Sequence, residues 1–144
     1  LSLMQDVGHK LRVYDKNAGG IAIDIRNCEL THKQWQCQLP AATHSTSILA
    51  KEAFSLFSRS YRWDLPIRSV TVRAINLSPQ SCPQQIDLFT DYTEINRKER
   101  IESVVENIRD RFGKYAIMPA ALCRNIKMPT DREIELKMPT GMIG

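Results

Sequence analysis

The sequence lacks several patterns that would assign it to a common class of protein. No apolar run approaches the roughly 20 residues that a membrane-spanning helix needs, so we expect no contact with a membrane interior. The four cysteines form no Cys-x-x-Cys pair and are scattered along the chain. Such scattering is typical of reduced intracellular proteins rather than disulfide scaffolds. We therefore expect free thiols and a cytoplasmic location.

The usual signatures of a catalytic site are also missing from the sequence. There is no glycine-rich phosphate loop and no glycine-framed nucleophile. The acidic residues are spread singly over predicted strands and loops, which disfavours a metal-binding carboxylate cluster. His32 lies between Cys28 and Cys37, but a structural zinc needs four ligands and the fourth has no candidate at a standard spacing. We expect neither a metal nor another cofactor in this chain, and a small stand-alone enzyme is disfavoured.

The composition that remains is that of one ordinary domain, or of a small domain with an extension. The chain has 144 residues, of which 42% are hydrophobic and 25% charged, and this length is enough to bury a core. A net charge of +4 and a pI near 9.0 favour a polyanionic partner only mildly, because basic and acidic residues are interspersed. The first residues lie inside a helical pattern, and we expect the chain to be part of a longer protein.

Hydrophobic periodicity predicts an α+β fold. The expected elements are a helix through the first dozen residues, strands at 21–25, 35–39 and 67–75, and helices at 45–61 and 96–113. The second strand should stop at Pro40, which cannot donate a hydrogen bond to a ladder. The last helix should begin at a capping box of Asn96 and Glu99 and end at Gly113. With another short strand near Ile134, we predict a mainly antiparallel sheet of about four strands with helices on one face.

Between the last strand and the last helix lies the pentapeptide Gln85-Ile86-Asp87-Leu88-Phe89, which follows a linker with two prolines. Large apolar side chains on a polar surface segment are poor core material, so they favour a pocket on another molecule. The alternative is that Ile86, Leu88 and Phe89 cover a local hydrophobic cluster and that the match is accidental. The pentapeptide resembles the sliding-clamp-binding motif of bacterial DNA polymerases and repair proteins. In that resemblance Gln85 is hydrogen-bonded, and Ile86, Leu88 and Phe89 fill the groove.

The order of elements and two phrases resemble the little-finger domain of bacterial Y-family translesion DNA polymerases, in the DinB/UmuC-like (ImpB/MucB/SamB) group. The phrases are Val-Gly-His-Lys-Leu-Arg at 7–12 and Ile-Arg-Ser-Val-Thr-Val-Arg-Ala-Ile-Asn-Leu at 67–77. Thr71 stands where the family often has glycine, and the clamp motif lies inside the chain rather than at its end. The resemblance implies a DNA-binding domain at 1–77, a linker with the clamp motif at 78–91, and a helical extension at 92–144.

The resemblance also implies a function in DNA repair, damage tolerance and the SOS response. The partners would be primer–template DNA, gripped by Arg26, Arg68, Thr71 and Arg73, and the sliding clamp. Taken singly, each of these four side chains could equally be an ordinary solvated strand residue. Catalysis in this family uses magnesium in a palm domain that this chain lacks, so the chain should not polymerise alone, although its parent should be a nucleotidyltransferase. The alternative is a non-catalytic protein-interaction module that uses the sheet face and helix 96–113.

Overall fold

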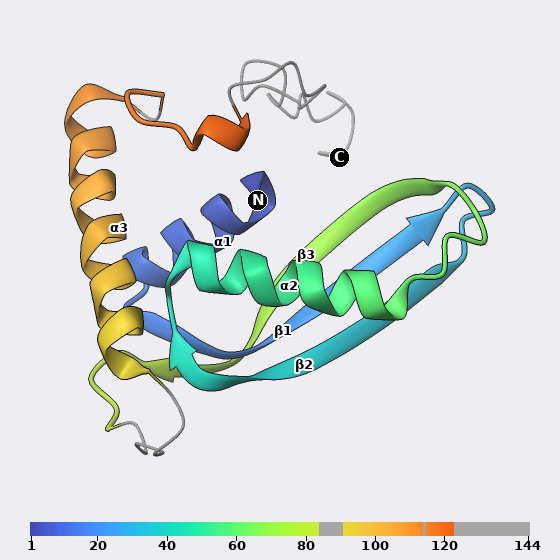
Figure 1. Cartoon of the computed structure of the whole chain (residues 1–144), viewed down its shortest axis with the longest axis horizontal. Helices are drawn as coiled ribbons and strands as arrows, with labels where there is room; N and C mark the ends of the chain where they lie inside the picture. The colour runs from blue at the N-terminus through green and yellow to red at the C-terminus, as the bar shows by residue number, and fades with distance from the viewer. Residues whose placement is uncertain (84–90, 114, 123–144) are drawn as a thin grey trace, which may run out of the picture.

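The computed structural model of this chain describes residues 1–83, 91–113 and 115–122. The fold is α+β, and Figure 1 shows two helices lying along one side of a long twisted sheet, with a third helix standing across one end. The elements are α1 (Ser2–Val13), β1 (Lys16–Asn27), β2 (His32–Thr43), α2 (Thr46–Ser60), β3 (Ile67–Pro79), α3 (Tyr92–Phe112) and the short 3-10 helix η1 (Ala120–Leu122).

The sheet is antiparallel and has the strand order β2-β1-β3. Its register places Ile23 of β1 opposite Trp35 on one side and Val72 on the other. Because side chains alternate across a strand, the isoleucines at 21, 23 and 25 all face the helices and are buried. The clear alternation in the second half of β1 therefore predicted the correct buried face.

Helices α1 and α2 close the core on the same side of the sheet. Met4 and Leu11 of α1 are buried, as are Leu49 and Leu56 of α2, at the helical spacing that the sequence indicated. Full burial of such a side chain contributes about 1.5–3 kcal/mol. The core is thus one cluster between the helices and the inner face of β1, and none of the described helices lies on the other face of the sheet (Figure 1).

Two expectations about the strands differ from the structure. The described residues form three strands rather than about four, and the strand suggested near Ile134 lies outside them. The prediction that Pro40 ends the second strand was wrong, because β2 continues to Thr43. The register shifts between Ala18 and Gly20, which pair with Thr43 and Gln38 respectively. A proline is tolerated there because β2 is an edge strand and the irregularity leaves its position without a ladder bond to donate.

The start of α3 also differs from the prediction. The helix begins at Tyr92 because Asp91 caps it, accepting a hydrogen bond from the Glu94 backbone N–H at 3.1 Å. Asn96 and Glu99 are therefore internal and do not form its capping box. The predicted end is confirmed: Gly113 has a φ of 97° and donates its backbone N–H to the Arg109 carbonyl. None of the side chains of α3 is buried.

Other features of the described segments bear on function. No helix in them has the length and apolar character to cross a membrane, and no group of three or more His, Cys, Asp and Glu side chains in them could hold a metal ion. Cys28, Cys37 and Cys82 are free thiols. The division of the chain at residues 77 and 91 stays a prediction.

Candidate nucleic-acid interface

The sheet face that turns away from the helices is lined mostly by polar side chains. Between positions 22 and 26 of β1, every second residue belongs to this face, and so do its partners on both neighbours. Three rungs result: Ala22 with Gln36 and Arg73, Asp24 with Gln34 and Thr71, and Arg26 with His32 and Ser69. We call these nine residues the open face.

The open face carries two arginines and one carboxylate. Asp24 accepts a hydrogen bond from His32 Nδ1 at 3.0 Å when that nitrogen is protonated, so the carboxylate is partly engaged within the face. Arg26 is half-buried, and its Nε is buried with no hydrogen-bond partner among the described residues. Arg73 is exposed and makes no ion pair within the part of the chain that the structure describes. The positive charge of this face is therefore available to an external anion.

The structure brings three of the four predicted DNA-binding residues together. Arg26, Thr71 and Arg73 lie on the open face on successive rungs. Arg68 is exposed, but it lies where the register shifts between the pairs Arg26–Ser69 and Asn27–Ile67, and it has no strand partner there. The predicted clamp-binding residues Gln85, Ile86, Leu88 and Phe89 lie outside the described residues, in the segment that joins β3 to α3.

Sequence reasoning missed the contribution of β2 to this face. His32, Gln34 and Gln36 alternate with Trp35 and Cys37, whose side chains pack against the core. The alternation of polar and apolar residues along β2 was present in the sequence. It could have identified the polar outer face of β2 as clearly as the same alternation did for β3. The open face is thus about as wide as all three strands, and amide and hydroxyl groups separate its arginines.

The open face has the chemistry of a surface that binds a phosphate backbone. Arginine guanidinium groups make strong, charge-assisted hydrogen bonds to phosphate oxygens. Glutamine amides and threonine and serine hydroxyls add neutral donors to the same oxygens, and contacts of this kind fix the register of a duplex without reading its sequence. A broad antiparallel sheet presents these hydrogen-bond donors over a width that can contact several successive phosphates.

Comparison with known proteins shows to which family this chain belongs. Residues 1–88 match the model of the impB/mucB/samB family C-terminal domain. The chain belongs to this family. The resemblance to the C-terminal region of Y-family DNA polymerases is thereby confirmed. The match stops at residue 88, before α3 begins at Tyr92.

Three curated relatives of this family member carry the name DNA polymerase IV. The protein from Acetivibrio thermocellus is 29% identical over 123 residues, which cover 85% of this chain and 31% of the relative. The protein from Alkaliphilus oremlandii is 25% identical over 131 residues, which cover 85% of this chain and 32% of the relative. The protein from Clostridium acetobutylicum is 27% identical over 122 residues, which cover 85% of this chain and 30% of the relative. The chain therefore spans about a third of the length of the curated relatives it matches.

Proposed function

We propose that this region binds primer–template DNA through the open face, as part of a Y-family translesion DNA polymerase that acts in DNA repair and damage tolerance. The observation that carries the proposal is the placement of Arg26, Thr71 and Arg73 on neighbouring rungs of a sheet face that none of the described helices covers. The family membership and the relatives named DNA polymerase IV support it. Binding through the backbone alone suits a polymerase that must accept distorted templates.

We further propose that Gln85, Ile86, Leu88 and Phe89 bind the bacterial sliding clamp. What supports this is the sequence of the motif and its place in the chain, in the segment between β3, which ends at Pro79, and α3. A tether at this point would keep the open face close to DNA encircled by the clamp, and linked sites of this kind raise the effective concentration of the second partner.

The DNA proposal is tested by titrating a labelled primer–template duplex against the full chain and the variants Arg26→Ala, Arg73→Ala and the double variant. Fluorescence anisotropy between about 50 and 200 mM salt gives the slope of log K against log salt, which should fall by about 0.9 for each phosphate contact removed. Arg59→Ala is the matched control, because Arg59 is an exposed arginine in the last turn of α2. Equal slopes for wild type, Arg73→Ala and Arg59→Ala would exclude the open face as the DNA-binding surface.

The clamp proposal is tested by calorimetry with purified bacterial sliding clamp at fixed salt. Replacing Leu88 and Phe89 together by alanine should weaken binding by several kcal/mol if each residue is a hot spot worth about 2 kcal/mol. The control is Leu77→Ala, which removes a 54% exposed leucine from β3 outside the motif. Unchanged affinity in the double variant would make the pentapeptide an accidental match.

A further inference from the structure

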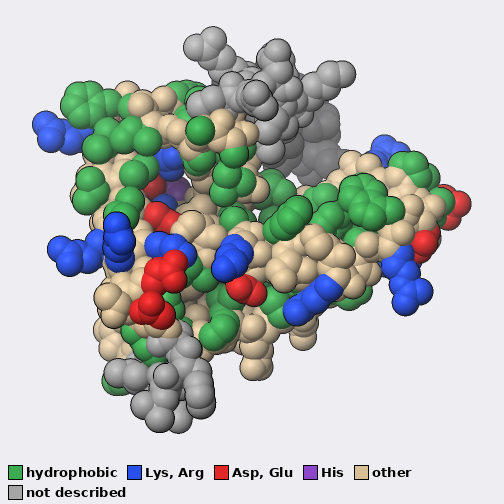
Figure 2. All heavy atoms as spheres, in the orientation of Figure 1, with side chains coloured by type: hydrophobic (Ala, Val, Ile, Leu, Met, Phe, Trp, Pro, Cys, Tyr) green, Lys and Arg blue, Asp and Glu red, His purple; other side chains and the backbone are tan. Residues whose placement is uncertain are grey.

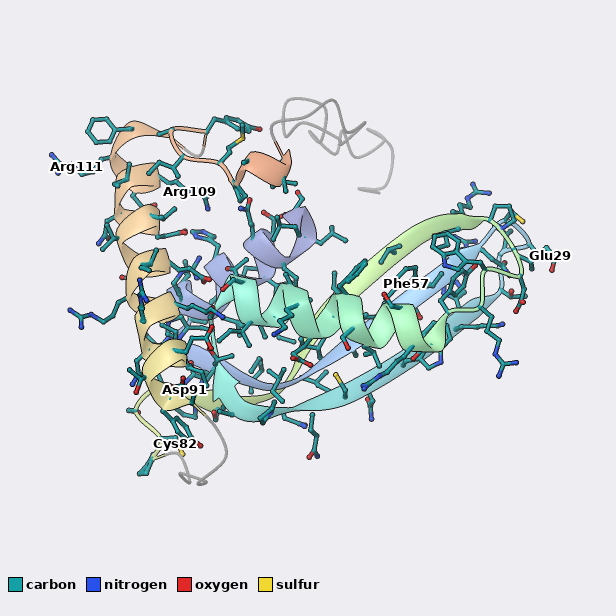
Figure 3. The ribbon with its side chains drawn as sticks, in the orientation of Figure 1. Glu29, Phe57, Cys82, Asp91, Arg109 and Arg111 are labelled. Atoms are coloured by element: carbon teal, nitrogen blue, oxygen red, sulfur yellow. The ribbon has the colours of Figure 1, made fainter. Side chains whose placement is uncertain are left out.

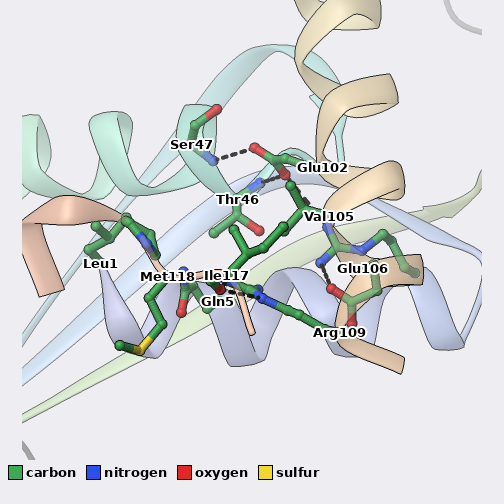
Figure 4. Close-up of a pocket in the computed structure, with 12 residues that line it drawn as sticks. Leu1, Gln5, Thr46, Ser47, Glu102, Val105, Glu106, Arg109, Ile117 and Met118 are labelled. Carbon is green, nitrogen blue, oxygen red and sulfur yellow. Dashed lines mark hydrogen bonds and ion pairs between the residues drawn. The ribbon is translucent and has the colours of Figure 1, made fainter. Parts of the chain in front are cut away.

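The half of α3 that faces the domain is acidic. Glu102 accepts hydrogen bonds from the backbone N–H groups of Thr46 and Ser47 at 2.6 and 3.0 Å (Figure 4). It also accepts one from the Ser45 hydroxyl at 2.9 Å. Arg12 of α1 pairs with Glu106 at 3.0 Å. These contacts fix which half of α3 remains free for other molecules.

Glu99 extends the same acidic surface. It accepts a hydrogen bond from the Thr43 hydroxyl, and its carboxylate lies 3.7 Å from His44 Nδ1. In the space-filling view, red acidic side chains accordingly lie between α3 and the rest of the domain (Figure 2). An amphipathic helix usually buries its apolar face, and α3 instead turns its carboxylates toward the domain.

The opposite half of α3 combines aliphatic and basic side chains. At 100° per residue, Arg97, Arg100 and Arg111 fall on this outer half together with Ile101 and Val104. Ile101 and Val104 are 53% and 58% exposed. Glu99, Glu102, Glu106 and Asp110 fall on the other half. Glu94 is the one acidic residue of α3 on the outer half, and its carboxylate pairs with Lys98 at 2.6 Å, so basic side chains predominate there. We call this half the outer face of α3.

The outer face has the shape and the free charge of a binding surface. A groove of about 650 Å³ runs along it, lined by residues that include Arg97, Arg100, Ile101 and Val104. Neither Arg97 nor Arg100 makes an ion pair with a described residue. Figure 3 shows Arg111 pointing away from the domain. An exposed apolar stripe bordered by unpaired charges is characteristic of a protein interface.

We propose that the outer face of α3 is a docking site for an acidic amphipathic helix of a partner protein. Such a helix would place apolar side chains against Ile101 and Val104 and its carboxylates beside Arg97 and Arg100. Recognition of an amphipathic helix in a groove through anchors spaced one turn apart is an established mode. Charge complementarity identifies the occupant, and steering between opposite charges would speed the encounter.

Other occupants fit the outer face less well. A second copy of α3 would bring arginines against arginines, and close like charges oppose association. DNA would use the arginines but leave Ile101 and Val104 in water. A membrane surface favours a broad apolar arc with large aromatic or leucine side chains, whereas here two exposed aliphatic residues lie between arginines beside a groove. The site lies on a different element from the open face, so this proposal does not rest on DNA binding.

The test uses the full chain and a fluorescein-labelled synthetic helix with leucines at i, i+3 and i+7 flanked by glutamates. A second peptide has lysines in place of the glutamates. Anisotropy should show binding of the acidic peptide with a micromolar Kd and at least tenfold weaker binding of the basic one. Arg97→Glu/Arg100→Glu should reverse this preference, and Val104→Glu should weaken the acidic peptide at least tenfold. Val13→Glu is the control, because Val13 is a 61% exposed valine on α1.

The same variants are also tested against the alternative occupants, which are a second copy of the chain, a membrane surface and DNA. Circular dichroism of every variant establishes that it is folded, and the charge reversal gives a gain of binding that a misfolded chain could not show. The proposal is overturned if the acidic peptide does not bind, or if Arg97→Glu/Arg100→Glu leaves its affinity unchanged. It is also overturned if Val104→Glu instead abolishes self-association in sedimentation, binding to vesicles of anionic lipid, or binding to duplex DNA.

Discussion

Glu102 of α3 holds the beginning of α2, and its replacement offers a direct test of the tertiary structure. The first N–H groups of a helix have no partner within the helix and are normally capped by the residue before it. Ser45 occupies that position but makes no side-chain capping hydrogen bond to α2. The Thr46 and Ser47 amides instead donate to Glu102, which lies more than 50 residues further along the chain.

The expected magnitude follows from these contacts. Loss of an N-terminal cap costs about 0.5–2 kcal/mol, and a hydrogen bond to a charged group contributes about 1.5–3 kcal/mol. The Glu102 side chain is 17% exposed, so solvent weakens these interactions only in part. We expect Glu102→Ala to lower the free energy of unfolding by about 2–3 kcal/mol, with a fall in Tm of roughly 5–10 °C. Glu102→Gln keeps one acceptor oxygen and should lose about half as much.

The assay is urea unfolding of the full chain, followed by far-ultraviolet circular dichroism, with amide hydrogen exchange resolved at Thr46 and Ser47. The matched control is Glu29→Gln, which removes an exposed carboxylate from the hairpin between β1 and β2, at the other end of the sheet from α3 (Figure 3). If Glu102→Ala and Glu29→Gln unfold at the same urea concentration, and Thr46 exchanges at the wild-type rate, the contact between α3 and α2 does not exist in solution.

The remaining predictions concern the same junction of helices. Burial alone would raise the pKa of Glu106, but its hydrogen bond to His9 and the charge of Arg12 hold that pKa below its usual value of 4.5. A lowered folded-state pKa stabilises the protein at pH values above the unfolded-state pKa. The stability advantage of wild type over Glu106→Gln should therefore decrease as the pH falls below 4.5, and an advantage that grows on acidification through this range would contradict the reasoning. Gly8→Ala should destabilise the protein by about 1–3 kcal/mol despite the better helix propensity of alanine, because the new Cβ would lie 2.2 Å from Thr46 Oγ1. Thr46→Ala should suppress most of that loss in a double-mutant cycle measured by urea unfolding, and simple additivity of the two substitutions would refute the close approach.

Local patterns in the sequence were sufficient wherever one periodicity governed an element. The isoleucines at 21, 23 and 25 alternate with smaller or polar residues, and this alone identified the central strand and its buried face. The stripe that includes Leu49 and Leu56 identified α2 in the same way. Arg26, Thr71 and Arg73 could be predicted to share one face because successive side chains along a strand point to opposite faces of the sheet. The family resemblance supplied the strand order.

The errors arose where a distant part of the chain satisfies a local group. Pro40 is accommodated because β2 is an edge strand with an irregular register, and neither fact can be read from the residues around it. Glu99 fits the spacing of a capping box, but its carboxylate accepts a hydrogen bond from Thr43 instead. The spacing of a capping motif shows only that two residues could form capping hydrogen bonds. The packing of α3 against the domain determined that Glu99 binds Thr43 instead.

The sequence by itself determined the α+β class, the core and the polar side of β1 and β3, because these follow from side-chain periodicity within each element. Only the tertiary structure decided the orientation of α3. Its apolar and acidic stripes are both periodic, and the pattern alone favours burial of the apolar one. The uncapped start of α2 and the cation of Arg12 offered the carboxylates of α3 a complementary surface, so the acidic half faces the domain and the outer face of α3 is left exposed.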